Sequence, residues 1–285
     1  MAGPDNGLGV STDVLVLGAG GRVGAALCRL LPGYGLTVRG LTRDEVDLGD
    51  DAALTDCIES TGARTVVYAI AIADPDRCEQ DPEASHLANV VGAQRVATIT
   101  ARLGGRLIYY STDYVFGAPG RYAEAAPVAP LQIYGRHKVE AERSVLSCGD
   151  NVVLRLPLLF GARDFVGAAV RAVLDGSPLA VDDRQRFPIP LTHVARATAR
   201  VIAPDTGSGI YHAVGSDVVT KAGWVEYIAG LLGRPLPPEP APSGADGAPR
   251  PVDVELTTRH PELRTPPGTL WAATRDRVTE LTPLP

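Results

Sequence analysis

DVLVLGAGGRVG (Asp13–Gly24) joins a short apolar run, rich in Val and Leu, to a cluster of glycines. The run is typical of a strand buried in a parallel sheet, and a helical pattern follows the glycines as far as Leu31. Glycines here let the backbone turn sharply and come close to a pyrophosphate, which the free N–H groups of the helix attract. The stretch therefore predicts a strand–turn–helix that binds a dinucleotide. We expect the contact to involve Gly18, Gly20, Gly21, Arg22, Val23 and Gly24.

Apolar runs of strand length alternate with helical patterns along the rest of the chain. Further strands are predicted at Leu36–Leu41, Arg64–Ala69, Arg106–Ser111, Asn151–Leu156 and Gly209–Val214. Helices are predicted at Ala52–Ser60, Asp81–Leu103, Tyr134–Leu146, Val166–Leu174, Leu191–Ile202 and Lys221–Leu232. Such alternation implies βαβ units and a parallel sheet. The predicted fold is an α/β, Rossmann-type doubly wound parallel sheet with a smaller, irregular α/β lobe at the C-terminal end.

Composition argues against several classes of protein. The 285 residues are 45% hydrophobic and carry a net charge of −6, which disfavours binding to nucleic acid or anionic membranes. No apolar run approaches the ~18–20 residues that span a bilayer, and residues 1–13 lack the features of a signal peptide. The four cysteines are scattered, as is typical of reduced thiols in the cytoplasm. The five histidines show no spacing of metal ligands, so no metal site is expected.

The end of the second predicted strand bears on the choice of dinucleotide. An NAD site would usually place an acid there, on the ribose 2′-hydroxyl. Here Thr42 and Arg43 follow the predicted strand directly, and an arginine suits a 2′-phosphate. NADPH is therefore favoured over NADH, although the adjacent Asp44 leaves NADH open.

With this cofactor, residues 1–160 would form the NADP-binding domain and residues 161–285 a substrate-binding lobe interleaved with it. The proline-rich residues 235–251 are expected to form a surface loop.

Two stretches carry candidate chemistry. YYSTDYVFG (Tyr109–Gly117) ends the fourth strand in hydroxyls and an acid, and YGRHK places Tyr134 and Lys138 four residues apart on one face of a helix. Tyrosine can supply the proton that an alkoxide needs, a nearby ammonium is expected to lower its pKa, and the Thr112 hydroxyl can hold the carbonyl oxygen. Taken singly, these are also common helix-face and strand-capping residues. In this order, after the glycine loop, they indicate reduction of a carbonyl group.

The chain resembles an extended short-chain dehydrogenase/reductase, and more narrowly the dTDP-4-dehydrorhamnose reductase family, the RmlD-like sugar-nucleotide-binding group. The resemblance rests on GAGGRVG, VDL, DPDRCEQDPEASHLANVVGA, STDYVFG, YGRHKVEAE, RLPLLFG and RFPIPLTHVARA. It implies NADPH-dependent reduction of a keto sugar carried on a nucleotide. The implied catalytic triad is Thr112, Tyr134 and Lys138. The resemblance also implies that Asp47, Leu48, Ala69 and Ala71 flank the cofactor, that Lys138 contacts its ribose, that Arg77, Asp113 and Tyr114 meet the substrate, and that Asn89 supports the site.

The substrate half departs from the rhamnose-forming pattern. Such members typically read RTSWLFG after the fifth strand, whereas RLPLLFG places Leu158 where the tryptophan would pack on the sugar. RLPLLFG and QRFP are closer to the regulatory β subunit of methionine adenosyltransferase. A non-catalytic NADP-binding subunit is therefore an alternative, and a sugar-nucleotide epimerase is another. A pocket for a nucleotide diphosphate is expected to use arginines of the second lobe, and a homodimer is possible. The pocket residues expected are Arg163, Arg184, Arg186 and Phe187.

Overall fold

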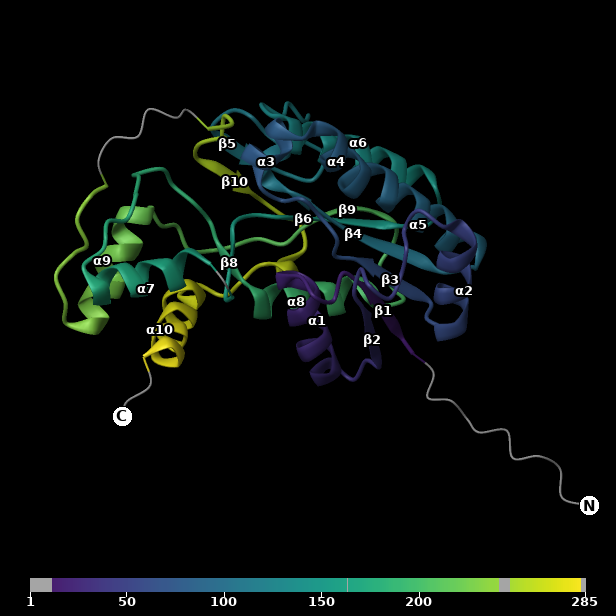
Figure 1. Cartoon of the computed structure of the whole chain (residues 1–285), viewed down its shortest axis with the longest axis horizontal. Coiled ribbons are helices and arrows are strands. Elements are labelled where there is room, and N and C mark those ends of the chain that lie inside the picture. The colour runs from purple at the N-terminus through teal and green to yellow at the C-terminus, as the bar shows by residue number, and fades with distance from the viewer. Residues whose placement is uncertain (1–11, 163, 241–246, 283–285) are drawn as a thin grey trace, which may run out of the picture.

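Parallel strands form the central sheet of the computed structural model, which describes residues 12–162, 164–240 and 247–282 (Figure 1). Within these residues the sheet has the strand order β2-β1-β3-β4-β6-β9, and every neighbouring pair is parallel. Its strands are β1 (Val14–Leu17), β2 (Val38–Leu41), β3 (Thr65–Tyr68), β4 (Arg106–Thr112), β6 (Val152–Leu156) and β9 (Gly209–His212). The order reverses between β1 and β3, which is where open α/β sheets bind ligands. The predicted fold class is confirmed.

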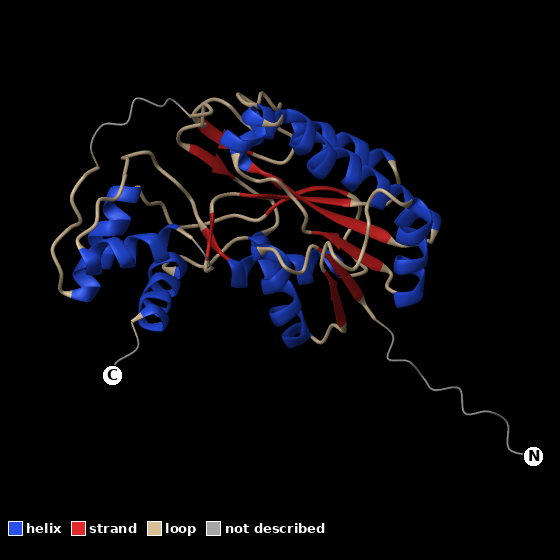
Figure 2. Ribbon diagram, in the orientation of Figure 1, coloured by secondary structure: helices blue, strands red, loops and turns tan. Residues whose placement is uncertain are grey.

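Helices cover both faces of this sheet (Figure 2). One face carries α1 (Arg22–Leu30) and α8 (Leu191–Ile202), and the other carries α2 (Asp51–Thr61), α5 (Gly92–Arg102) and α6 (Ile133–Ser147). Strand β1 explains why both faces must be covered. Val14 and Val16 pack in the core beneath α1 and α8, while Leu15 and Leu17 pack in the core beneath α2, α5 and α6. All four side chains are fully buried, as an apolar run without alternation requires.

The helix predicted over Asp81–Leu103 is divided in the structure. Helix α3 (Pro75–Gln80) is followed by α4 (Pro82–His86), a π-helical turn η2 (Leu87–Val91) and then α5. The hydroxyls of Tyr68 and Tyr109 donate to the carbonyl oxygens of Ala88 and Asn89, over 2.7 and 2.9 Å. The two tyrosines thus satisfy backbone groups in the π turn. Such turns occur frequently at functional sites, and this one lies beside the carboxyl ends of β3 and β4.

A second group of helices lies at one end of the sheet, at the left of Figure 1. Helices α7 (Phe165–Asp175), α9 (Lys221–Leu232) and α10 (Thr269–Leu281) pack around the fully buried Trp224. Segments after residue 160 also join the main sheet, because β9 pairs with β6 and α8 packs on α1. The division at residue 160 stays a prediction. No helix among the described residues is long and apolar enough to cross a membrane.

Short elements connect these layers. Strand β5 (Gly120–Tyr122) pairs with β10 (Val254–Leu256), and β7 (Leu159–Phe160) pairs with β8 (Ile189–Pro190). Single 3-10 turns lie at η1 (Leu31–Tyr34), η3 (Asp113–Val115) and η4 (Pro261–Leu263). The β5–β10 pair ties the chain after the proline-rich segment to the region beyond β4. Of that segment, residues 241–246 lie outside the described residues.

Candidate active site

The glycine loop between β1 and α1 is tightly packed. Gly18 has φ +92°, and a Cβ there would lie 2.8 Å from Ile70 Cγ1. A Cβ on Gly24 would lie 2.2 Å from the carbonyl oxygen of Gly18, so the helix can approach the strand only with glycine at this position. Helix α1 begins at Arg22, and no side chain caps its first turn. The backbone N–H groups of this first turn are therefore available to a ligand, and they fit the pyrophosphate of a dinucleotide. This agrees with the predicted role of the loop.

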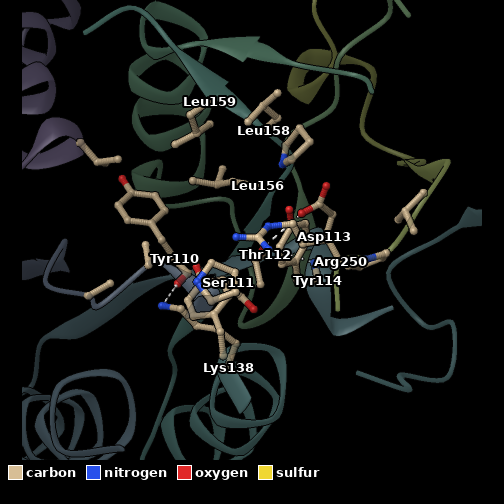
Figure 3. A pocket seen from close by; sticks show the side chains of 18 of the residues that line it. Tyr110, Ser111, Thr112, Asp113, Tyr114, Lys138, Leu156, Leu158, Leu159 and Arg250 are labelled. Atoms are coloured by element: carbon tan, nitrogen blue, oxygen red, sulfur yellow. Dashed lines mark hydrogen bonds between the residues drawn. The ribbon is translucent and has the colours of Figure 1, made fainter. Parts of the chain in front are cut away.

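A cavity of about 460 Å³ extends from this loop along the carboxyl ends of the strands (Figure 3). It brings together residues from the glycine loop, the ends of β3, β4 and β6, helix α6 and the C-terminal part of the chain. Predicted site residues that line it are Gly21, Arg22, Val23, Ala69, Ala71, Thr112, Asp113, Tyr114, Tyr134, Lys138, Leu158, Arg184, Arg186 and Phe187. The cavity therefore joins the predicted cofactor, catalytic and substrate residues in one space.

Helix α6 carries the tyrosine and the lysine into this cavity. Gln132 caps the helix by accepting from the Gly135 N–H, and a Cβ on Gly135 would lie 2.4 Å from the carbonyl oxygen of Tyr114. The start of the helix is thereby held against η3. Tyr134 and Lys138 follow on the face turned to the sheet, with 8% and 2% of their surfaces exposed. Lys138 Nζ donates to the carbonyl oxygen of Tyr110 over 2.9 Å.

Burial controls the proton affinity of this pair. It lowers the pKa of Lys138 to about 7, although Glu142 opposes the shift. It raises the pKa of Tyr134 well above that of an ordinary tyrosine, and the nearby Asp113 adds to the increase. The expectation that the ammonium would lower the tyrosine pKa is therefore wrong: desolvation of the phenolate is the largest contribution to the shift, and the charge of Asp113 acts in the same direction. Tyr134 keeps its proton at neutral pH, which is the form that can protonate an alkoxide.

The end of β4 presents a hydroxyl and an acid to the same space. Thr112 Oγ1 donates to Asp113 Oδ1 over 3.0 Å and accepts from the Tyr114 N–H over 3.2 Å. Burial raises the pKa of Asp113 to about 7, although hydrogen bonds from Thr112 and the backbone and the charge of Arg186 act in the opposite direction. The cavity thus contains a phenol, a hydroxyl and a carboxyl that titrates near neutrality.

Arginines also line the cavity. Both Nη atoms of Arg186 bind the carboxylate of Asp182, over 2.6 and 2.8 Å, and both Nη atoms of Arg250 bind Asp76, over 3.2 and 2.6 Å. Arg184 lines the cavity beside them. Sequence reasoning missed Arg250, because it lies in the proline-rich segment assigned to a surface loop. Its only sequence signal is a positive charge. Arg163 lies outside the described residues.

Other predicted residues lie away from the cavity. Arg77 is exposed on α3 and does not line it. Arg43 and Asp47 are exposed just beyond β2, and the Asp47 carboxylate accepts from the Gly49 N–H. Leu48 is half-buried nearby. Asn89 is fully buried in the π turn, where its Nδ2 donates to the Ile72 carbonyl over 3.0 Å and to Ser85 Oγ over 3.1 Å. Asn89 therefore fixes the loop after β3.

The sheet order, the glycine loop at the switch point and the Tyr–Lys pair in one cavity define an extended short-chain dehydrogenase/reductase. Within that class the chain belongs to the RmlD substrate binding domain family, whose model matches residues 12–280. The predicted family is confirmed.

Named relatives point in two functional directions. The chain is 30% identical over 247 residues to a dTDP-4-dehydrorhamnose reductase of Mycolicibacterium smegmatis, covering 84% of this chain and 75% of the relative. It is 34% identical over 235 residues to the methionine adenosyltransferase 2 subunit beta of Danio rerio, covering 76% and 72%. Its fold matches the dTDP-4-dehydrorhamnose reductase of Bacillus anthracis solved in complex with NADP, with a TM-score of 0.79, 19% identity and coverage of 96% and 98%.

Proposed function

We propose that the protein is an NADPH-dependent reductase of a keto group on a nucleotide-activated sugar or a related cyclic ketone. The observation that carries this proposal is the single cavity that Thr112, Tyr134 and Lys138 line together with the glycine loop and a group of arginines. The relatives named as dTDP-4-dehydrorhamnose reductases support the same reaction.

The residues of the glycine loop fit the cofactor. Gly18 and Gly24 leave no room for a side chain, so the backbone itself forms the cradle, and the uncapped first turn of α1 supplies N–H donors. Arg43 lies exposed beyond β2, where it can meet a 2′-phosphate. When bound, NADPH supplies a hydride to the carbonyl carbon.

The proton comes from the protein. The Tyr134 phenol, kept protonated by its raised pKa, donates its proton to the oxygen that becomes the alcohol. Lys138 is held in place by the Tyr110 carbonyl. Its charge stabilises the phenolate left behind, because the two groups share a poorly solvated site. Thr112 lies at the end of β4, where a hydroxyl can hold the substrate oxygen.

The arginines of the cavity suit the nucleotide part of the substrate. Arg184, Arg186 and Arg250 line the cavity, and arginine forks match the oxygens of a diphosphate. Leu158, with 36% of its surface exposed, lines the same cavity in place of the expected tryptophan. An aliphatic side chain at this position leaves open which keto sugar the pocket takes, so the ketone need not be dTDP-4-dehydrorhamnose.

A second candidate function is a binding subunit that holds NADP and docks on a partner enzyme. The 34% identity to a methionine adenosyltransferase subunit favours it. NADPH oxidation in the presence of nucleotide-activated keto sugars separates the two functions. Thermal-shift measurements with NADPH and a panel of nucleotide sugars identify ligands in either case, because ligands of the folded state raise its melting temperature. Cofactor binding without turnover of any ketone would favour the subunit.

Assembly and location are further parts of the proposal. The four cysteines are free thiols in the structure, which suits the reducing cytoplasm. A homodimer formed through helices of the sheet layers is compatible with the proposed reaction. Size-exclusion chromatography with light scattering would test it.

A further inference from the structure

Arg250 reaches the cavity wall from the last part of the chain (Figure 3), and a carboxylate from the first half of the chain holds it. Both Nη atoms of Arg250 donate to the two oxygens of Asp76, over 3.2 and 2.6 Å. The Ala248 N–H donates to Asp76 Oδ1 over 2.7 Å. Asp76 lies on α3, 174 residues before Arg250. The contact therefore fixes residues 247–251 to helix α3.

This contact leaves one edge of the guanidinium unused. Arg250 Nη1 also donates to the Ala248 carbonyl over 2.9 Å, so the three bonds to protein occupy three of the five guanidinium protons. Among the described residues, no hydrogen bond uses Nε or the second proton of Nη2. These two N–H groups lie side by side, and such a fork matches two oxygens of a phosphate.

Arg186 is held in the same pattern. Its Nη1 donates to Asp182 Oδ1 over 2.6 Å and to the Arg184 carbonyl over 2.8 Å, and its Nη2 donates to Asp182 Oδ2 over 2.8 Å. Both arginines line the cavity, whereas neither Asp76 nor Asp182 does. Each carboxylate thus anchors an arginine from outside the cavity and leaves the Nε edge available inside the site.

The segment that carries Arg250 is closely packed. A Cβ on Gly247 would lie 2.7 Å from Asp76 Oδ1 and 3.1 Å from Arg250 Nη1, so any larger residue would crowd the ion pair. Further along, Asp253 Oδ1 accepts from the Gln185 N–H over 2.7 Å, and β10 pairs with β5. The segment is held at three places, so the position of Arg250 is set before a ligand arrives.

We propose that Asp76 is a positioning residue for the substrate: it holds Arg250 so that the unused edge of the guanidinium binds the diphosphate of a nucleotide-activated sugar. Competition between Asp76 and the diphosphate for Arg250 is disfavoured, because the carboxylate occupies the two Nη atoms and leaves the Nε edge unoccupied. The role rests on the proposed function, since it assumes a substrate that carries a nucleoside diphosphate.

Calorimetric titration of the full chain with dTDP and with UDP tests this role. In Asp76→Asn, binding of the diphosphate should weaken at least about fivefold, within the coupling that contacting residues show. Asparagine has the same shape and can still accept from the Ala248 N–H, but it carries no charge to hold the guanidinium. NADPH affinity should stay within about twofold, because the glycine loop is not altered.

Asp74→Asn is the matched control. Asp74 is exposed two residues earlier and caps α3 by accepting from the Asp76 N–H, and asparagine caps a helix as well as aspartate does. Its diphosphate affinity should stay within about twofold of the wild type.

Two further variants separate positioning from general stabilisation. With Arg250→Gln already present, Asp76→Asn should change diphosphate affinity by no more than about twofold, because Asp76 acts through the arginine. Gly247→Ala keeps both charges and should weaken diphosphate binding, since its Cβ crowds the pair. Gly33→Ala, where a Cβ meets nothing within 4 Å, should not.

The role is overturned by unchanged or tighter diphosphate binding in Asp76→Asn, by equal weakening of diphosphate and NADPH, or by the same weakening with and without Arg250. Tighter binding would show that Asp76 competes with the ligand, and the other two results would show a structural role. A wild type that binds neither dTDP nor UDP would overturn it together with the nucleotide part of the proposed function. Failure of the reductase function alone is distinguishable: the variants would show the expected affinities, but the wild type would oxidise NADPH with no ketone.

Discussion

Lys138 Nζ donates a hydrogen bond to the backbone carbonyl of Tyr110 over 2.9 Å, so the ammonium is anchored to the end of β4. The Tyr109 ring centroid lies 4.5 Å from the same nitrogen and the Tyr134 ring centroid 5.7 Å from it. Helix α6 is thereby fixed against the sheet, with both of its functional side chains on the cavity wall.

Tyr134→Phe should keep cofactor affinity and lose turnover by on the order of 10² or more, because the proton donor is removed while the packing of the ring is retained. Titration of NADPH fluorescence gives the affinity, and single-turnover kinetics gives the rate. An undiminished rate would remove Tyr134 from the mechanism.

Arg43→Ala should weaken NADPH binding more than NADH binding. The side chain is exposed beyond β2, so its loss should affect a 2′-phosphate without disturbing the core. Dissociation constants of both cofactors, measured by calorimetry, provide the comparison. Equal losses for NADPH and NADH would refute the 2′-phosphate assignment.

Arg250→Gln should weaken binding of a nucleotide sugar about tenfold or more, because a charge-assisted contact contributes about 1.5–3 kcal/mol. Arg121→Gln is the matched control. Arg121 lies on β5, where it pairs with Glu255 of β10, and its side chain is 72% exposed. It does not line the cavity. Binding of the ligand found by thermal shift should weaken in the first variant alone, and comparable weakening in both would contradict a direct role for Arg250.

Asp113→Asn should stabilise the folded protein at alkaline pH. The folded pKa of Asp113, about 7, lies above its ordinary value, so the wild type loses stability as pH rises from about 4 to 7 and no further above that. Between pH 5 and 8 the variant should gain about 3 kcal/mol relative to the wild type, at 1.36 kcal/mol per pKa unit. Urea unfolding of the variant and the wild type at pH 5 and at pH 8 measures this difference in the free energy of unfolding. A gain that is the same at pH 5 and pH 8 would contradict the raised pKa.

Gly24→Ala should destabilise the protein by about 1–3 kcal/mol or more, because the added Cβ would lie 2.2 Å from the Gly18 carbonyl oxygen. Gly33→Ala is the control, since a Cβ there meets nothing within 4 Å. It should change the unfolding free energy by at most about 0.5 kcal/mol. Denaturant unfolding of both variants checks the contrast, and a tolerated Gly24→Ala would mean that the loop can relax away from β1.

Local patterns were sufficient to predict most of the sheet. Each strand that is buried on both faces has a continuous apolar run, and the helices around it have their own period, so the α/β class follows from sequence. The divided helix after β3 was not predicted, because the π turn depends on hydroxyls of Tyr68 and Tyr109 that arrive from other strands. Strand β10 was also missed, since its three residues pair with β5 across a large separation in the chain.

The sequence by itself determined the dinucleotide loop, the alternation of strands and helices in the main sheet, and the presence of Tyr134 and Lys138 on one helical face. These features depend on neighbours within a few residues. Tertiary structure alone placed Arg250 beside Arg184 and Arg186 and showed that Arg77 lies outside the cavity. It also reversed the expected shift of the Tyr134 pKa. A proton affinity depends on how much water the whole fold excludes from a side chain, and local sequence does not contain that information.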